Sequence, residues 1–154
     1  MLRTPLALCL LIAAPVAAQT AAQEDRFHAA MQAMEARTRA FYISVDPRFA
    51  SLLAPGDENP AFRDSQRCLL RRLADEGGAD MLAEYIAAAE FMASSEITSL
   101  VELGERVPSV MTSDLVFAAA ADCGPMSQST KAMMTPEFQD LMDDPKVMQG
   151  LMGQ

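Results

Sequence analysis

Apolar residues recur every three or four positions along most of the chain, and two-residue alternation over the length of a strand is hard to find. A spacing of three and four places side chains on one face of an α-helix, whereas alternation is typical of a half-buried strand. The pattern therefore predicts an all-α fold, a small bundle of about five to seven helices.

The clearest amphipathic helix is predicted from about Ala22 to Ser44, and the Val45-Asp46-Pro47 sequence ends it. Its apolar face is formed by Phe27, Met31, Met34, Thr38 and Phe41. A short apolar turn follows over 49–53. The proline, glycine and short polar residues of 54–59 then predict a loop.

Capping residues and helix-breaking residues divide the middle of the chain. Asn59 is a predicted N-cap with Pro60 at the first helical position, and Gly77-Gly78 ends that helix. A long helix is predicted over 79–106, with a candidate irregularity at residues 94–95, and Pro108 ends it. A further helix is predicted over 109–122.

The last twenty residues, 135–154, have a different composition. Thr135-Pro136 and Asp144-Pro145 each place a capping residue before a first-turn proline, which predicts two short helices in tandem. Methionine is frequent here and just upstream, at Met126, Met133, Met134, Met142, Met148 and Met152. The segment is thus predicted to be the methionine-rich end of a single helical domain over 19–154.

Residues 134–152, MTPEFQDLMDDPKVMQGLM, resemble the helical repeats with Asp-Pro or Asn-Pro found in domains of stress-inducible co-chaperones. The methionine-lined grooves of that family take apolar segments, so the resemblance implies a groove of this kind. It covers only this short segment, and no residue role is transferred from it.

The methionines allow two interpretations apart from metal binding. As core residues, their flexible thioethers fill irregular gaps between short helices. As a surface, the same adaptability suits a groove for apolar peptides. The residues of such a groove would be Phe138, Leu141, Met142, Val147, Met148 and Leu151.

A third interpretation is a soft-metal site, because thioethers prefer Cu(I) among the common metal ions. The candidate ligands are His28, Met31 and Met34, which follow one another at intervals of three residues. On a helix these side chains would lie within about one third of the circumference. Met31 and Met34 also belong to the apolar face, where core packing explains them equally well.

Residues 1–18 have the three parts of an export signal. Arg3 supplies the positive start, 6–14 form an apolar run, and small residues precede a cleavage site after Ala18. The run falls short of the ~20 residues that span a bilayer, and Pro15 interrupts it. We therefore expect a periplasmic or secreted protein without a stable membrane span, from which Cys9 is removed with the signal.

Cys68 and Cys123 are the cysteines that remain after cleavage. An even number of thiols in an oxidising compartment predicts one disulfide bond between them. In the chain-entropy model, closing a span of this length stabilises a domain by about 4 kcal/mol. The absence of a Cys-x-x-Cys pair favours a structural role over redox catalysis.

The net charge and the absence of several catalytic motifs exclude some classes of function. The formal net charge of −9 becomes −10 once Arg3 is removed, which disfavours nucleic acids and anionic membranes as partners. The sequence has no nucleophile elbow, phosphate-binding loop or dinucleotide fingerprint, and one histidine cannot supply the usual zinc cluster. We therefore expect a non-enzymatic protein without a cofactor, with a protein-interaction or chaperone-like stress role. Its expected partners are other exported proteins or apolar peptides.

Overall fold

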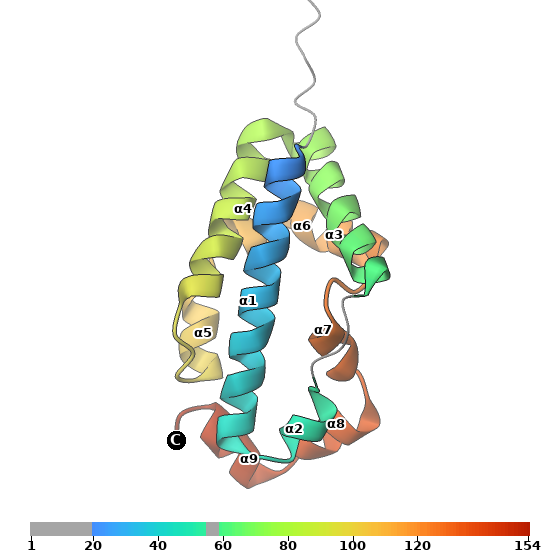
Figure 1. Cartoon of the computed structure of the whole chain (residues 1–154). Coiled ribbons are helices and arrows are strands. Elements are labelled where there is room, and N and C mark those ends of the chain that lie inside the picture. Colours follow the sequence, from blue (N-terminus) through green and yellow to red (C-terminus); the bar gives the residue numbers. More distant parts are fainter. Residues whose placement is uncertain (1–19, 55–58) are drawn as a thin grey trace, which may run out of the picture.

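The computed structural model describes residues 20–54 and 59–154, and this part of the chain is helical with no strand (Figure 1). The predicted all-α fold is confirmed. The predicted export signal, residues 1–18, lies outside the described residues, as do 55–58 of the predicted loop.

Helix α1 (Ala21–Val45) is the longest described helix and runs along the whole molecule (Figure 1). Thr20 begins it through a capping box, in which its hydroxyl accepts from the backbone N–H of Gln23 while the Gln23 side chain accepts from the N–H of Thr20. The helix ends at Val45 with Asp46 as its C-cap, just before the proline that predicts its end. Both halves of α1 contribute buried side chains, but these pack against different neighbours.

The first core surrounds the N-terminal half of α1. It is built with α3 (Pro60–Arg72), the π-helical turn η1 (Leu73–Gly77), α4 (Gly78–Ser94) and α6 (Asp114–Cys123). Phe27 of α1 is fully buried there, and its ring lies 5.5 Å from that of Tyr85. Gly78 turns the chain from η1 into α4 with a φ of 82°, a conformation that glycine adopts without steric cost.

The second core surrounds the C-terminal end of α1. Helices α2 (Phe49–Leu52), α8 (Pro136–Met142) and α9 (Pro145–Leu151) pack there. The ring of Phe49 lies 4.9 Å from that of Tyr42 and 5.3 Å from that of Phe138. A Cβ atom at Gly150 would lie 2.7 Å from Cγ1 of Val45, so the missing side chain lets α9 approach α1 closely.

The long helix predicted over 79–106 is divided in two, and the break lies at the candidate irregularity of residues 94–95. Helix α4 ends at Ser94, and α5 (Leu100–Arg106) begins after an extended segment with Ser99 as its N-cap. The hydroxyls of Ser94 and Ser95 both donate to the carbonyl of Phe91, at 2.8 and 2.9 Å. Such local bonds compete with the helical ladder, which accounts for the break at these serines.

The predicted helix over 109–122 is also divided. A 3₁₀ turn, η2 (Ser109–Thr112), comes first, and Ser113 then caps α6 by accepting from the N–H of Val116. Helix α7 (Gln128–Ala132) was not predicted, because five residues are too few to show a helical period. Its N-cap is Ser127, whose hydroxyl accepts from the N–H of Thr130 at 3.0 Å.

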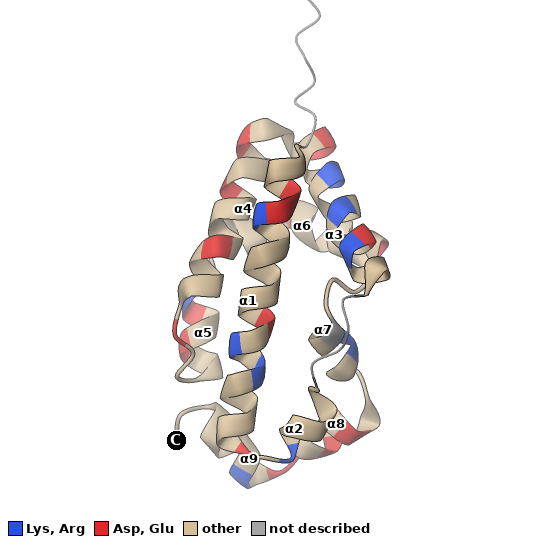
Figure 2. Cartoon of the chain, viewed as in Figure 1, with Lys and Arg blue, Asp and Glu red and all other residues tan. Residues whose placement is uncertain are grey.

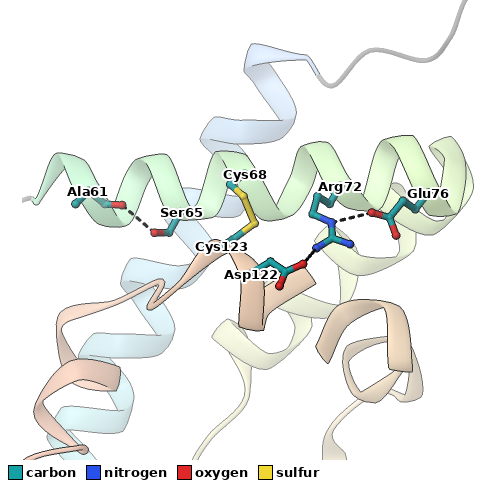
Figure 3. The surroundings of a disulfide bond; sticks show 7 residues. All are labelled: Ala61, Ser65, Cys68, Arg72, Glu76, Asp122 and Cys123. Atoms are coloured by element: carbon teal, nitrogen blue, oxygen red, sulfur yellow. Dashed lines mark hydrogen bonds and ion pairs between the residues drawn. A yellow bond between two sulfur atoms is a disulfide. The ribbon is translucent and has the colours of Figure 1, made fainter. Parts of the chain in front are cut away.

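The predicted disulfide between Cys68 and Cys123 is present (Figure 3). It joins α3 to α6, and the two Cα atoms are 5.7 Å apart, within the range that a disulfide spans. One turn along α3, Arg72 pairs with Asp122 of α6 and with Glu76. The two helices are thus linked covalently and by an adjacent ion pair.

Basic residues gather along α3, in a chain that is acidic as a whole (Figure 2). Arg63 lies 2.9 Å from Asp25, and Arg67 lies 3.0 Å from Glu24, so α3 and α1 are paired through opposite charges. Ion pairs with this degree of solvent exposure contribute little to stability. Among the described helices, none combines the length and the apolar character needed to cross a membrane.

The buried Tyr85 side chain predicts that the protein loses folding stability at alkaline pH. The side chain is 3 % exposed, and burial raises its pKa to about 12, whereas an unfolded tyrosine titrates near pH 10. Because the folded-state pKa is the higher one, this contribution to stability is complete below about pH 10 and is lost as the pH rises towards 12. We expect the free energy of unfolding to fall by about 1 kcal/mol between about pH 9 and pH 11.

Urea unfolding at the two pH values measures this fall. The Tyr85→Phe variant has no phenol to ionise at this position, so its fall should be smaller than that of the unmodified protein. An equal fall in both proteins would contradict the assignment to Tyr85.

Candidate functional site

A hollow of about 130 Å³ lies between α1 and the segment 127–133, which contains α7. We call it the methionine hollow. It is lined by Met31, Met34, Glu35, Thr38, Ser127, Ser129, Thr130 and Met133. Met31 and Met34 pack against the first core and Met133 against the second, so the hollow lies where the two cores meet. Thr130 is exposed, so the lining reaches the surface.

The α1 side of the hollow follows from helical spacing. Met31, Met34, Glu35 and Thr38 are at positions i, i+3, i+4 and i+7, which share one face of a helix. All four are partly buried. Three of them belong to the apolar face predicted for this helix, and Glu35 adds a carboxylate to it.

Glu35 positions the opposite wall. Its Oε1 atom accepts from the backbone N–H of Ser129 at 3.0 Å and from the hydroxyl of Ser129 at 2.9 Å. Ser127 and Ser129 are buried, and both hydroxyls have partners. These bonds hold the start of α7 against α1, and the hydroxyls that face the hollow are held in defined positions.

The three predicted metal ligands, His28, Met31 and Met34, do not face the same space in the structure. The two methionines line the hollow, whereas His28 faces α3: its Nδ1 lies 2.7 Å from Oε1 of Gln66, and its Nε2 lies 3.1 Å from Nε2 of Gln32. His28 and Met34 are six residues apart, which turns them about 120° around the helix. That angle is enough for the two side chains to face different neighbours.

The predicted peptide-binding residues lie in the second core. Phe138, Leu141, Val147 and Leu151 are at most 8 % exposed, and Met142 and Met148 pack against them. Their faces on α8 and α9 are covered by the aromatic cluster of α1 and α2. An apolar segment would reach these side chains only if α8 and α9 separated from α1.

Ser127, Ser129, Thr130 and Met133 line the hollow but were not predicted from the sequence to belong to a site. The available signal was Ser127, a residue type that is preferred at helix N-caps. Met133 was noted only among the methionines of the C-terminal region. Nothing in the sequence separates it from Met134, which is 77 % exposed.

The volume and the side chains of the hollow limit what it can bind. Sites for drug-sized ligands have volumes of roughly 300–1,000 Å³, whereas an apolar cavity of about 150 Å³ binds benzene. The methionine hollow is therefore sized for one side chain or one ion. In the described part of the chain, no three His, Cys, Asp or Glu side chains are grouped so that they could hold a metal ion.

Comparison with protein-family models, with curated proteins and with solved structures finds no match for this chain.

Proposed function

We propose that this chain is an exported, non-enzymatic protein that binds apolar segments of other exported proteins, with one side chain of the segment inserted into the methionine hollow. The observation that supports this function is the methionine hollow itself, a side-chain-sized space at the junction of two cores. Its role would be chaperone-like, or that of an adaptor for a small set of partners.

The chemistry of the walls supports an apolar side chain of variable shape. Met31, Met34 and Met133 have unbranched, polarisable side chains that adjust to different partners, and methionine is common at promiscuous binding surfaces. Ser127 and Thr130 also line the hollow, and their hydroxyls would offer polar contacts to the backbone of a bound segment. A single anchoring side chain in a pocket is a common source of most of the binding energy in such complexes.

Two features support an exported location. The pattern of residues 1–18 is that of a signal peptide, and disulfide bonds such as Cys68–Cys123 persist in oxidising compartments. These two features support a proposed location in the periplasm or the medium, with other exported proteins as partners. The formal net charge of −9 would favour segments in which basic residues flank the apolar one.

Filling the hollow tests the proposed function. Thr38→Phe places a ring in the space, so we expect a labelled polar peptide with one phenylalanine and flanking lysines to bind at least about tenfold more weakly, a loss of about 1.4 kcal/mol. Fluorescence anisotropy measures the affinity. Thr112→Phe is the matched control, because Thr112 is exposed in η2 outside the hollow.

Equal binding by the Thr38→Phe variant and the unmodified protein would show that the segment binds elsewhere. The hollow is a better target than a deletion of residues 135–154, because that segment supplies half of the second core and its loss would unfold the site.

A further inference from the structure

We propose that the methionine hollow is also a binding site for one Cu(I) ion, held by the thioether sulfurs of Met31, Met34 and Met133. The site differs from the set predicted from sequence, because it replaces His28 with a methionine from the opposite wall. It requires only the hollow and does not depend on the binding of protein segments.

Ligand chemistry favours a soft monovalent ion at this place. Thioether sulfur is a soft donor that selects Cu(I) over hard cations such as Mg²⁺ and Ca²⁺. Met31 and Met34 are almost one helical turn apart on α1, and Met133 faces them from beyond α7. Each side chain has three rotatable bonds, which gives the sulfurs the freedom to turn towards a shared ion.

Neither the two cysteines nor Glu35 is expected to compete strongly for such an ion. Thiolates are stronger soft ligands than thioethers, but Cys68 and Cys123 are joined in a disulfide and cannot bind as thiolates. The carboxylate of Glu35, which is a hard ligand, already accepts two hydrogen bonds from Ser129 through Oε1. The thioethers of Met31, Met34 and Met133 are soft donors that line one small hollow, and they are the ligands of the proposed site.

Charge also favours a cation. The chain has a formal net charge of −9, which raises the local concentration of cations around it. Glu35 adds a negative charge in the wall of the hollow itself. The site would therefore attract a positive ion before the sulfurs bind it.

The experiment is a titration of the full mature protein with Cu(I), kept reduced by ascorbate, against a competing Cu(I) chelator. We expect one ion per chain. The triple variant Met31→Leu, Met34→Leu, Met133→Leu should bind Cu(I) at least about tenfold more weakly, since removing even a residue that only supports a metal ligand costs this much. Leucine keeps the apolar character of these positions, so the variant tests the loss of the sulfur atoms.

Two matched controls locate the site. Met134→Leu removes a thioether next to Met133 that lies outside the hollow, and His28→Ala removes the imidazole that faces α3. Both variants should keep the affinity of the unmodified protein. Equal affinity in the triple variant would overturn the proposal, and a loss in His28→Ala would overturn the three-thioether site.

A second measurement does not depend on the stability of the variants. In the unmodified protein labelled with ¹³C-methyl methionine, Ag(I) as an air-stable substitute should shift the methyl signals of Met31, Met34 and Met133. Shifts confined to other methionines would contradict the site. Since the peptide assay with Thr38→Phe does not involve metal, either proposal can fail without the other.

Discussion

Replacing Cys68 and Cys123 together with alanine should lower the free energy of unfolding by about 4 kcal/mol. The disulfide restricts the unfolded chain by closing a separation of 55 residues. It also fixes α3 to α6, two helices that both contribute to the first core. Chemical denaturation of the unmodified protein and the double variant measures the difference.

A reduced and alkylated sample of the unmodified protein provides the control, because it lacks the bond without a substitution at either position. We expect it to show a similar loss of stability. The ion pair between Arg72 and Asp122 remains in both samples, and as an exposed contact it cannot replace the bond (Figure 3). Equal stability with and without the disulfide would mean that it adds nothing to the fold.

Phe49→Ala should destabilise the protein by about 4 kcal/mol, because it leaves a cavity at the centre of the second core. Phe49 is fully buried, and its ring packs against those of Tyr42 and Phe138. These contacts join α2 to α1 and α8, so their loss should also loosen the C-terminal helices. Urea unfolding gives the stability, and hydrogen exchange shows whether α8 and α9 lose protection first.

Phe91→Ala is the matched control, because Phe91 is 51 % exposed on α4. Its stability should lie within about 0.5 kcal/mol of the unmodified protein. Phe27→Ala removes an equally buried ring from the first core and should cost about as much as Phe49→Ala. If Phe49→Ala were no more harmful than Phe91→Ala, the second core would not be packed as described.

The sequence predicts well those features that depend on local chemistry. The apolar spacing of α1 and the proline after its end predict its bounds, and Asn59 with Pro60 predicts the start of α3. The disulfide follows from the number of thiols left after the expected cleavage. In each case, the signal lies in a few neighbouring residues or in a simple count.

Some features depend on side chains that compete with backbone hydrogen bonds, or on contacts between distant residues. These features cannot be predicted from local patterns. Residues 94–95 were recognisable as a candidate irregularity, but the apolar spacing continues across them, so the full break that their hydroxyl bonds to Phe91 accompany was not predicted. The division of the C-terminal residues between core and surface depends on which face α8 and α9 turn towards α1. Periodicity identifies an apolar face, but it does not show whether another helix covers it.

The same limit applies to the candidate site. Met31 and Met34 were identified from helical spacing, but Met133 enters the hollow through α7, which is too short for its position to be read from the sequence. Glu35 fixes α7 by bonds to a residue 94 positions away. Contacts of this separation are formed only in the folded chain.

The central claim is that the methionine hollow is the binding site of this protein. The most direct test is a titration of the ¹³C-methyl methionine-labelled protein with the peptide that carries one phenylalanine, followed by methyl NMR. We expect the signals of Met31, Met34 and Met133 to shift in a saturable way while that of Met134 stays unchanged. Shifts confined to Met142 and Met148, or no saturable shift at all, would contradict the claim.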